Sequence, residues 1–202
     1  MARIGCDLDG VLADIVAQLV AFAREKYGID LQREQIVSEH AHTCTPLSIE
    51  QLESLFRDRG FFSGMPPMLD ACAALRDIQG LGFEVDIVTD RFWYSEIADD
   101  TKQWLAKHEI PFSKLIFARR GEKQLVAAER GHRLFIEDQA ANARIIISVT
   151  AVYLLDRPYN RALRPSERVH RVASMEEILK ELRAAGHQEP YLSARPTTLS
   201  AE

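Results

Sequence analysis

Short apolar segments alternate with segments of helical periodicity along most of the chain. The apolar, β-prone runs predict buried strands at residues 2–6, 83–88, 115–117, 134–136 and 151–155. Apolar residues at helical spacing predict helices at residues 11–27, 48–59, 69–79, 95–108, 122–130 and 174–185, with a short one after residue 136. Strands that alternate with helices in this way specify an α/β fold, a Rossmann-like parallel sheet with helices on both faces.

The size and charge of the chain narrow the class of protein. At 202 residues it has room for one domain, or for one domain with a sizeable insertion. The net charge of −5 argues against a nucleic-acid polymer as partner, while a small anionic ligand still fits a locally positive site. We find neither a leader segment nor an apolar span of about 18 residues, so we expect a cytoplasmic protein without membrane contact. The oligomeric state stays open, a homodimer included.

The segment Asp7-Leu8-Asp9-Gly10 follows the first predicted strand and carries the strongest local signal for chemistry. Side chains two apart on a strand point to the same side, so Asp7 and Asp9 leave the strand end together, and Gly10 permits a sharp turn. A divalent cation removes the repulsion between paired carboxylates, and oxygen ligands favour Mg²⁺. A carboxylate beside the metal can attack a phosphorus atom. A calcium loop is the alternative, but its closing glutamate position, counted from Asp7, is occupied by Gln18.

Polar residues also stand at the ends of later strands. Thr89, Asp90 and Arg91 follow the second predicted strand, and Glu137 and Asp138 follow the fourth. Ligands of parallel sheets bind beyond the carboxyl ends of the strands, at the switch in strand order. We therefore expect these side chains to gather around one site with the first motif.

The region between the first two strands contributes helices but no convincing strand. We interpret residues 15–68 as a small helical cap inserted over the site, and residues 1–14 and 69–186 as the core. The tail, residues 187–202, has little apolar content and is expected to be disordered. Within the cap, His40, His42 and Cys44 suggest a zinc cluster, but no fourth ligand follows at a familiar spacing, and a surface loop of a lid is favoured.

Across residues 3–160 the chain resembles the haloacid dehalogenase superfamily of phosphohydrolases. The motifs that carry the likeness appear in the expected order: residues 7–11, Val88-Thr89, Lys123 at the start of a helix, and Glu137-Asp138. Within the superfamily the chain is most similar to the 5'(3')-deoxyribonucleotidase family. That finer likeness rests on residues 7–14, 60–68 and 155–160. The resemblance implies a haloacid dehalogenase-like core.

The resemblance also implies roles for these residues. Asp7 would be the nucleophile and Asp9 the acid and base of a two-step reaction through an aspartyl-phosphate. Mg²⁺ would be held by the Asp7 carboxylate, the backbone carbonyl of Asp9 and Asp138. Thr89 and Lys123 would bind the phosphate oxygens.

Three neighbours of these motifs need separate interpretation. Glu137 is expected to support the metal site from behind rather than to ligate, and Asn142 to orient Asp138 if the chain turns helical there. Asp90 occupies a phosphate-contacting position that is usually small or hydroxylated in the relatives. A carboxylate there repels phosphate, so we favour pairing of Asp90 with Arg91, Arg119 or Arg120. The alternatives are that Asp90 contacts a substrate hydroxyl or amine, or that the native ligand is not an ordinary nucleotide.

The substrate is the least determined feature. Phe61, Phe62 and Trp93 are candidates for stacking on a nucleobase, or else they line the contact between cap and core, and Arg91 is a candidate for a second anionic group. The expected function is Mg²⁺-dependent hydrolysis of a small phosphorylated substrate, with nucleoside or deoxynucleoside monophosphates as first choice. The alternatives are a phosphatase for another small metabolite and a catalytically silent protein that binds a phosphorylated ligand.

Overall fold

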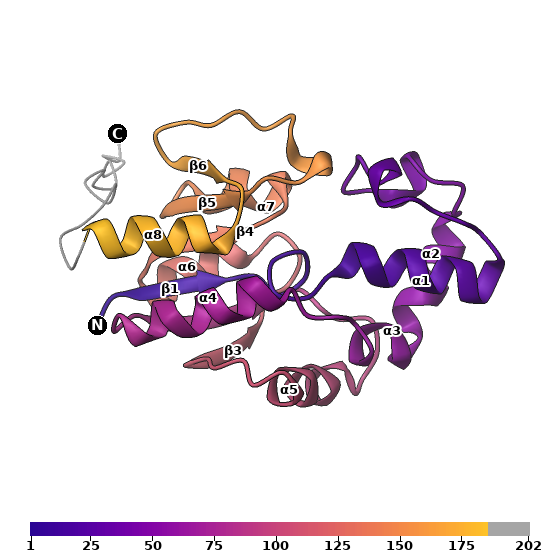
Figure 1. Cartoon of the computed structure of the whole chain (residues 1–202), viewed down its shortest axis with the longest axis horizontal. Helices are drawn as coiled ribbons and strands as arrows, with labels where there is room; N and C mark the ends of the chain where they lie inside the picture. Colours follow the sequence, from indigo (N-terminus) through magenta and orange to yellow (C-terminus); the bar gives the residue numbers. More distant parts are fainter. Residues whose placement is uncertain (186–202) are drawn as a thin grey trace, which may run out of the picture.

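A computed structural model describes residues 1–185 of the chain, and in this part six parallel strands form one sheet (Figure 1). The spatial order is β3-β2-β1-β4-β5-β6. The strands are β1 (Arg3–Cys6), β2 (Glu84–Thr89), β3 (Lys114–Phe117), β4 (His132–Glu137), β5 (Ala151–Leu155) and β6 (Val169–Val172). The α/β fold with a Rossmann-like parallel sheet is thereby confirmed, while the predicted disordered tail lies outside the described residues.

Helices cover both faces of the sheet because neighbouring side chains of each strand point to opposite sides. On one face α4 (Leu69–Gly80) and α8 (Met175–Ala185) pack side by side over Ile4 and Ile136, and α5 (Ile97–Lys107) adds Trp104 to the same core. On the other face α6 (Lys123–Arg130) and α7 (Ala140–Ile146) pack over Phe135 and Val152. Figure 1 shows α4 and α8 running together beside β1.

The helices between β1 and α4 lie beyond the C-terminal end of β1, at one end of the molecule (Figure 1). We call residues 15–68 the cap. Its elements are α1 (Ile15–Tyr27), η1 (Arg33–Gln35), η2 (Ala41–Thr43), α2 (Ile49–Arg57) and α3 (Arg59–Ser63). The chain enters and leaves the cap at one place, because Ala13 and Pro67 form a β-bridge and the Asp14 amide donates to the Pro66 carbonyl at 2.8 Å.

Several element boundaries differ from the predicted ones. The first helix begins at Ile15 rather than at residue 11, because residues 8–13 form a turn and the side chain of Asp14 caps α1 by accepting from the Ala17 amide. The helix predicted at 48–59 has the expected capping box of Ser48 and Gln51 but ends at Arg57. Strand β6 was not predicted, since its central residues are polar and only its ends are buried.

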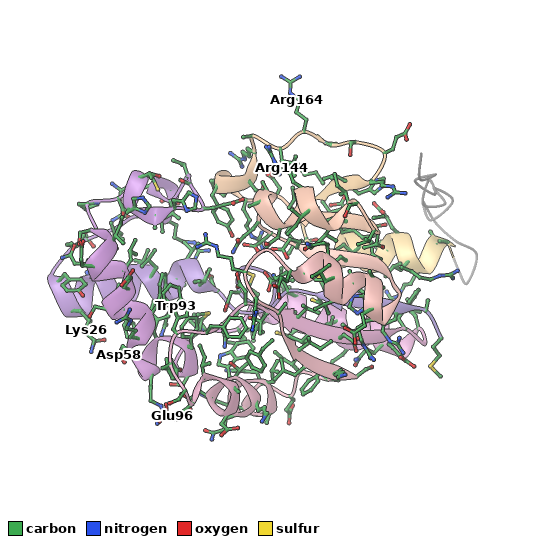
Figure 2. All side chains as sticks on the ribbon, turned by 180° about the vertical axis from the view of Figure 1, so that it is seen from behind. Lys26, Asp58, Trp93, Glu96, Arg144 and Arg164 are labelled. Carbon is green, nitrogen blue, oxygen red and sulfur yellow. The ribbon has the colours of Figure 1, made fainter. Side chains whose placement is uncertain are left out.

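Asp58 starts a new helix where one continuous helix and then a loop were predicted. Its carboxylate accepts from the Gly60 amide at 2.8 Å and pairs with Lys26 at 3.0 Å (Figure 2). The predicted loop carrying Phe61 and Phe62 is therefore wrong, and both aromatics lie on α3. No helix in residues 1–185 is long and apolar enough to cross a membrane.

Candidate active site

Three buried carboxylates meet beyond the ends of the central strands. Asp7 follows β1, Glu137 ends β4 and Asp138 comes next, and their ligand oxygens lie within 4.8 Å of one another. The neighbouring strands hold this arrangement, since the Asp7 amide donates to the Ile136 carbonyl at 2.9 Å. Glu137 and Asp138 reach the same cluster although they are adjacent, because the strand ends between them.

Lys123 places a cation against this cluster. It is the first residue of α6, its side chain is 1% exposed, and its Nζ lies 2.7 Å from Asp7 Oδ2 and 3.0 Å from Glu137 Oε2. Burial works against the ammonium charge, but the carboxylates of Asp7, Glu137 and Asp90 outweigh it and raise the pKa of Lys123. Lys123 is therefore charged and fixed in direction.

Hydrogen bonds to one carboxylate oxygen of Glu137 orient the other oxygen toward Lys123. Its Oε1 accepts from the Asn142 side chain at 3.2 Å and from the Gln139 amide at 3.1 Å, while Oε2 faces Lys123. The expectation that Asn142 orients Asp138 is wrong, because the first turn of α7 brings its amide to Glu137. Glu137 thus orients the lysine, and Asn142 orients Glu137.

Asp138 has one partnered and one unpartnered carboxylate oxygen. The Tyr159 hydroxyl donates to Oδ2 at 2.6 Å, and Oδ1 is buried without a hydrogen bond from any residue in the described part of the chain. Asn160 fixes the backbone by donating to the Asp138 carbonyl at 2.6 Å. The sequence motifs predict no role for Tyr159 or Asn160, although both lie in the segment 155–160 that carries part of the family likeness.

The cluster fits a divalent cation. Burial, then the carboxylate of Glu137, raise the pKa of Asp7, and burial, then Asp7, raise the pKa of Asp138 to about 7. One lysine faces three carboxylates, so negative charge is in excess, and Asp138 Oδ1 has no donor. All-oxygen ligands suit Mg²⁺ rather than zinc or copper. Asp7 and Asp138 can hold such an ion.

Gly10 lies directly against Asp138, and there is no space for a side chain at this position. Its φ of +77° lies in the left-handed region, and a Cβ there would stand 2.0 Å from Asp138 Oδ2. Arg157 fixes this turn, since its Nη2 donates to the Gly10 carbonyl at 2.9 Å. Gly10 is therefore required both by its backbone conformation and by the approach of Asp138.

Thr89 and Asp90 reach the site from the end of β2. The Thr89 hydroxyl is buried and has no partner among the described residues, as a group awaiting a ligand oxygen would be. The charge of Asp90 acts on both Asp7 and Lys123. In residues 1–185 no arginine pairs with Asp90, so that expectation is wrong.

The arginines expected to pair with Asp90 lie elsewhere. Arg91 turns the opposite way and holds Asp9, with Nε 2.8 Å from Oδ2 and Nη2 2.5 Å from Oδ1. Arg119 and Arg120 are exposed. Consecutive side chains of an extended segment point to opposite sides, which separates Arg91 from Asp90. Asp9 occupies the guanidinium of Arg91, and the expected contact of Arg91 with a second anionic group stays a prediction.

The aromatic residues pack the junction of cap and core. Phe61 and Phe62 are 0% and 2% exposed and pack edge to face with centroids 5.1 Å apart, so the expectation that they contact substrate is wrong. Trp93 is 40% exposed and lies 4.8 Å from the Phe56 ring, beside the cap helices (Figure 2). Trp93 alone of these three presents surface to a ligand.

The histidine-rich part of the cap forms no metal site with the described residues. His40 and His42 are exposed in and beside η2, with ring centroids 5.9 Å apart. Within residues 1–185 the group of Asp7, Glu137 and Asp138 is the only metal-capable cluster of histidine, cysteine and acidic side chains.

Comparison with solved structures identifies the fold. L-2-haloacid dehalogenase from Xanthobacter autotrophicus superposes with a TM-score of 0.60 at 12% identity, over 91% of this chain and 99% of that chain. A HAD-superfamily hydrolase of subfamily IA, variant 1, from Geobacter sulfurreducens gives 0.57 at 19% identity, over 89% and 95%. The chain therefore has the haloacid dehalogenase-like fold.

The family follows from the sequence comparison. The family "5' nucleotidase, deoxy (Pyrimidine), cytosolic type C protein" matches residues 1–186, and the chain belongs to it. A protein of Chlorobaculum tepidum named "Putative 5'(3')-deoxyribonucleotidase" is 32% identical over 152 residues, covering 69% of this chain and 70% of that protein. The resemblance predicted from the motifs is confirmed, and the protein is a 5'-nucleotidase-like phosphatase of the haloacid dehalogenase type.

Proposed function

We propose that this protein is a Mg²⁺-dependent phosphomonoesterase that hydrolyses nucleoside or deoxynucleoside monophosphates through an aspartyl-phosphate on Asp7. One observation carries the proposal: Asp7 lies between a buried ammonium, at 2.7 Å from Lys123 Nζ, and a second buried carboxylate with an unpartnered oxygen. The ammonium offsets part of the repulsion between the Asp7 carboxylate and a dianionic phosphate, and Mg²⁺ held by Asp7 and Asp138 would offset more of it. The family membership supports the substrate class.

Asp7 is held for an in-line attack. Its Oδ1 accepts from the Leu8 amide at 2.7 Å and Oδ2 faces Lys123, so the carboxylate has a fixed plane. In the first step a carboxylate oxygen of Asp7 bonds to phosphorus, the bond to the substrate oxygen breaks, and Asp9 gives that oxygen its proton. In the second step Asp9 takes a proton from water, whose oxygen bonds to phosphorus as the bond to Asp7 breaks.

The remaining phosphate oxygens need donors throughout both steps. Lys123 Nζ contacts Asp7, and the buried Thr89 hydroxyl, at the end of the neighbouring strand β2, has no partner among the described residues; we assign both to this task. Mg²⁺ would be held by Asp7, Asp138 and the backbone carbonyl of Asp9. Bound there, it would supply positive charge that neutralises the phosphate oxygens and shields them from the Asp7 carboxylate.

The proposal is tested with a panel of phosphorylated metabolites assayed with Mg²⁺ and with a chelator. We expect Mg²⁺-dependent phosphate release from nucleoside monophosphates, and loss of turnover in Asp7→Asn protein that remains folded. Preferential turnover of sugar phosphates would show that the protein is a phosphatase for another small metabolite. Turnover of no phosphoester, with phosphate binding retained, would favour a silent binding protein.

The family description also bears on location and partners. Its words "cytosolic type" support a cytoplasmic location, which we propose for this chain. The proposed partner is the small phosphorylated substrate. The absence of a nucleic-acid partner and the homodimer both stay predictions.

A further inference from the structure

We propose that Arg91 is the positioning residue for the acid–base carboxylate of Asp9, and that it ties this carboxylate to the cap. The inference rests on the proposed function, because it concerns the proton transfers assigned to Asp9. It adds a residue that lies outside the phosphate and metal contacts described above.

Arg91 engages both oxygens of the Asp9 carboxylate. Its Nε lies 2.8 Å from Oδ2 and its Nη2 lies 2.5 Å from Oδ1, so the two planar groups meet fork to fork. Such a bidentate pair fixes both the direction and the rotation of a carboxylate, which a lysine ammonium does not do. Asp9 stands on the turn after β1, where a free side chain would otherwise rotate. Both oxygens accept from Arg91 in this pair, so Arg91 sets the orientation from which one oxygen must leave to carry the proton.

The guanidinium is itself immobilised from several elements. Its side chain is 1% exposed, and Nη1 donates to the Thr101 hydroxyl of α5 at 3.2 Å. On the cap side, the Phe62 ring of α3 lies over the guanidinium with its centroid 4.8 Å from Cζ, and Met65 Sδ lies 4.0 Å from Nη2. Burying an arginine this fully is costly unless it is paired and anchored.

These contacts connect the cap to the reaction. Proton transfer needs Asp9 within hydrogen-bond reach of the leaving oxygen, and a small misplacement is expensive in rate. Because Phe62 and Met65 belong to the cap, a shift of α3 moves the support of Arg91 and with it Asp9. When one Asp9 oxygen turns to the substrate, the other keeps its bond to Arg91. The position of the cap therefore affects the orientation of the Asp9 carboxylate through the side chain of Arg91.

The test uses two substrates that differ in their need for a proton. Departure of a nucleoside alkoxide requires protonation by Asp9, whereas p-nitrophenolate leaves without it. We expect Arg91→Met to lower kcat/KM on a nucleoside monophosphate by about 10²-fold, and on p-nitrophenyl phosphate by less than about tenfold. The ratio of the two values is independent of the folded fraction of the sample. A purely structural role would lower both alike and leave the ratio unchanged.

Control variants sharpen the result. Arg91→Lys keeps the charge but loses the fork, so its ratio should shift in the same direction by a smaller factor. Arg130→Met removes an arginine that forms a bidentate pair with buried Asp86, at 2.8 and 3.3 Å, away from the acidic cluster, and its ratio should equal that of the wild type. Phe62→Leu keeps an apolar side chain but removes the ring under Arg91, and should shift the ratio as Arg91→Lys does.

The outcomes separate the inference from the function on which it rests. An active wild-type enzyme whose ratio is unchanged in Arg91→Met overturns the inference and leaves the proposed function standing. An unchanged ratio in Phe62→Leu alone overturns the tie to the cap. A wild-type protein that hydrolyses neither ester overturns the proposed function, and the role of Arg91 falls with it.

Discussion

The hydroxyl of Tyr159 donates a hydrogen bond to Oδ2 of Asp138 at 2.6 Å, which leaves Oδ1 as the carboxylate oxygen that faces the site without a donor. Tyr159 thus decides which oxygen of Asp138 is available to a cation. The two residues come from different loops, since Tyr159 follows β5 and Asp138 follows β4. Partners of this kind orient metal ligands and tune their affinity.

Replacing Tyr159 by phenylalanine should raise the Mg²⁺ concentration for half-maximal activity by about 10- to 100-fold, because the carboxylate loses its orienting donor. A Mg²⁺ titration of phosphatase activity measures this. Tyr153→Phe is the matched control, since its hydroxyl donates to Glu181 rather than to Asp138. A Tyr159→Phe enzyme with a wild-type Mg²⁺ requirement would contradict the role given to this hydroxyl.

Substitutions of Asp138 and Glu137 should change different kinetic parameters, the first the Mg²⁺ requirement and the second the KM for substrate. Asp138→Asn removes a metal ligand, so the Mg²⁺ requirement should rise by well over about tenfold while the KM at saturating Mg²⁺ changes little. Glu137→Gln loosens Lys123, so we expect the KM for substrate to rise and the Mg²⁺ requirement to change less. Both parameters are measured on both variants. If Glu137→Gln instead raised the Mg²⁺ requirement more than Asp138→Asn did, Glu137 would be the metal ligand.

The pKa of Asp138 predicts how stability depends on pH in the absence of metal. Burial raises this pKa to about 7, while an unfolded aspartate titrates near about 3.9. The folded state therefore binds the proton more tightly. The contribution of Asp138 to the free energy of unfolding is fully present below about pH 4 and is lost as pH rises through about 7, an effect of about 4 kcal/mol.

Urea unfolding in a chelator between pH 5 and 8 measures this dependence, and the difference between wild type and Asp138→Asn isolates it from other titrating groups. Mg²⁺ binds the ionised carboxylate, so its stabilising effect should increase over the same range. A difference curve that is flat with pH would show that Asp138 is already ionised at pH 5 in the metal-free protein.

The charge of Asp90 acts on Asp7 and Lys123, and within residues 1–185 Asp90 forms no ion pair, so it should oppose the binding of dianionic phosphate. We expect Asp90→Ser to raise kcat/KM on nucleoside monophosphates by about tenfold, which corresponds to about 1.4 kcal/mol. Asp99→Ser, an exposed position on α5 paired with Lys102, is the control. A loss of activity in Asp90→Ser would instead show that this carboxylate holds Lys123 or a substrate hydroxyl.

The sequence was sufficient for five of the six strands and for the groups at their ends, because strand ends are fixed by local apolar runs and by topology, and it missed β6 because the central residues of that strand are polar. Asp7, Thr89 and Asp138 follow from that logic, whereas Lys123, at the start of a helix, came from the resemblance to the superfamily motifs. The partnership of Arg91 with Asp9 spans 82 positions and depends on how one side chain rotates, which no local pattern encodes.

Other expectations failed for similar physical reasons. Asn142 turned to Glu137 because the first turn of α7 sets its direction. Phe61 and Phe62 became buried because the side chain of Asp58 caps a new helix, where the pattern of aromatics and glycines predicted a loop.

The bridge between Ala13 and Pro67 has a consequence for how this protein can be varied. Beside it, the Met68 amide donates to the Leu12 carbonyl at 2.7 Å, so the two ends of the intervening segment are already joined. A segment whose ends meet imposes almost no spacing demand on the rest of the chain. A shorter or longer replacement of residues 15–66 would therefore leave the register of β1 untouched, but Arg91 would lose the contacts that Phe62 and Met65 provide.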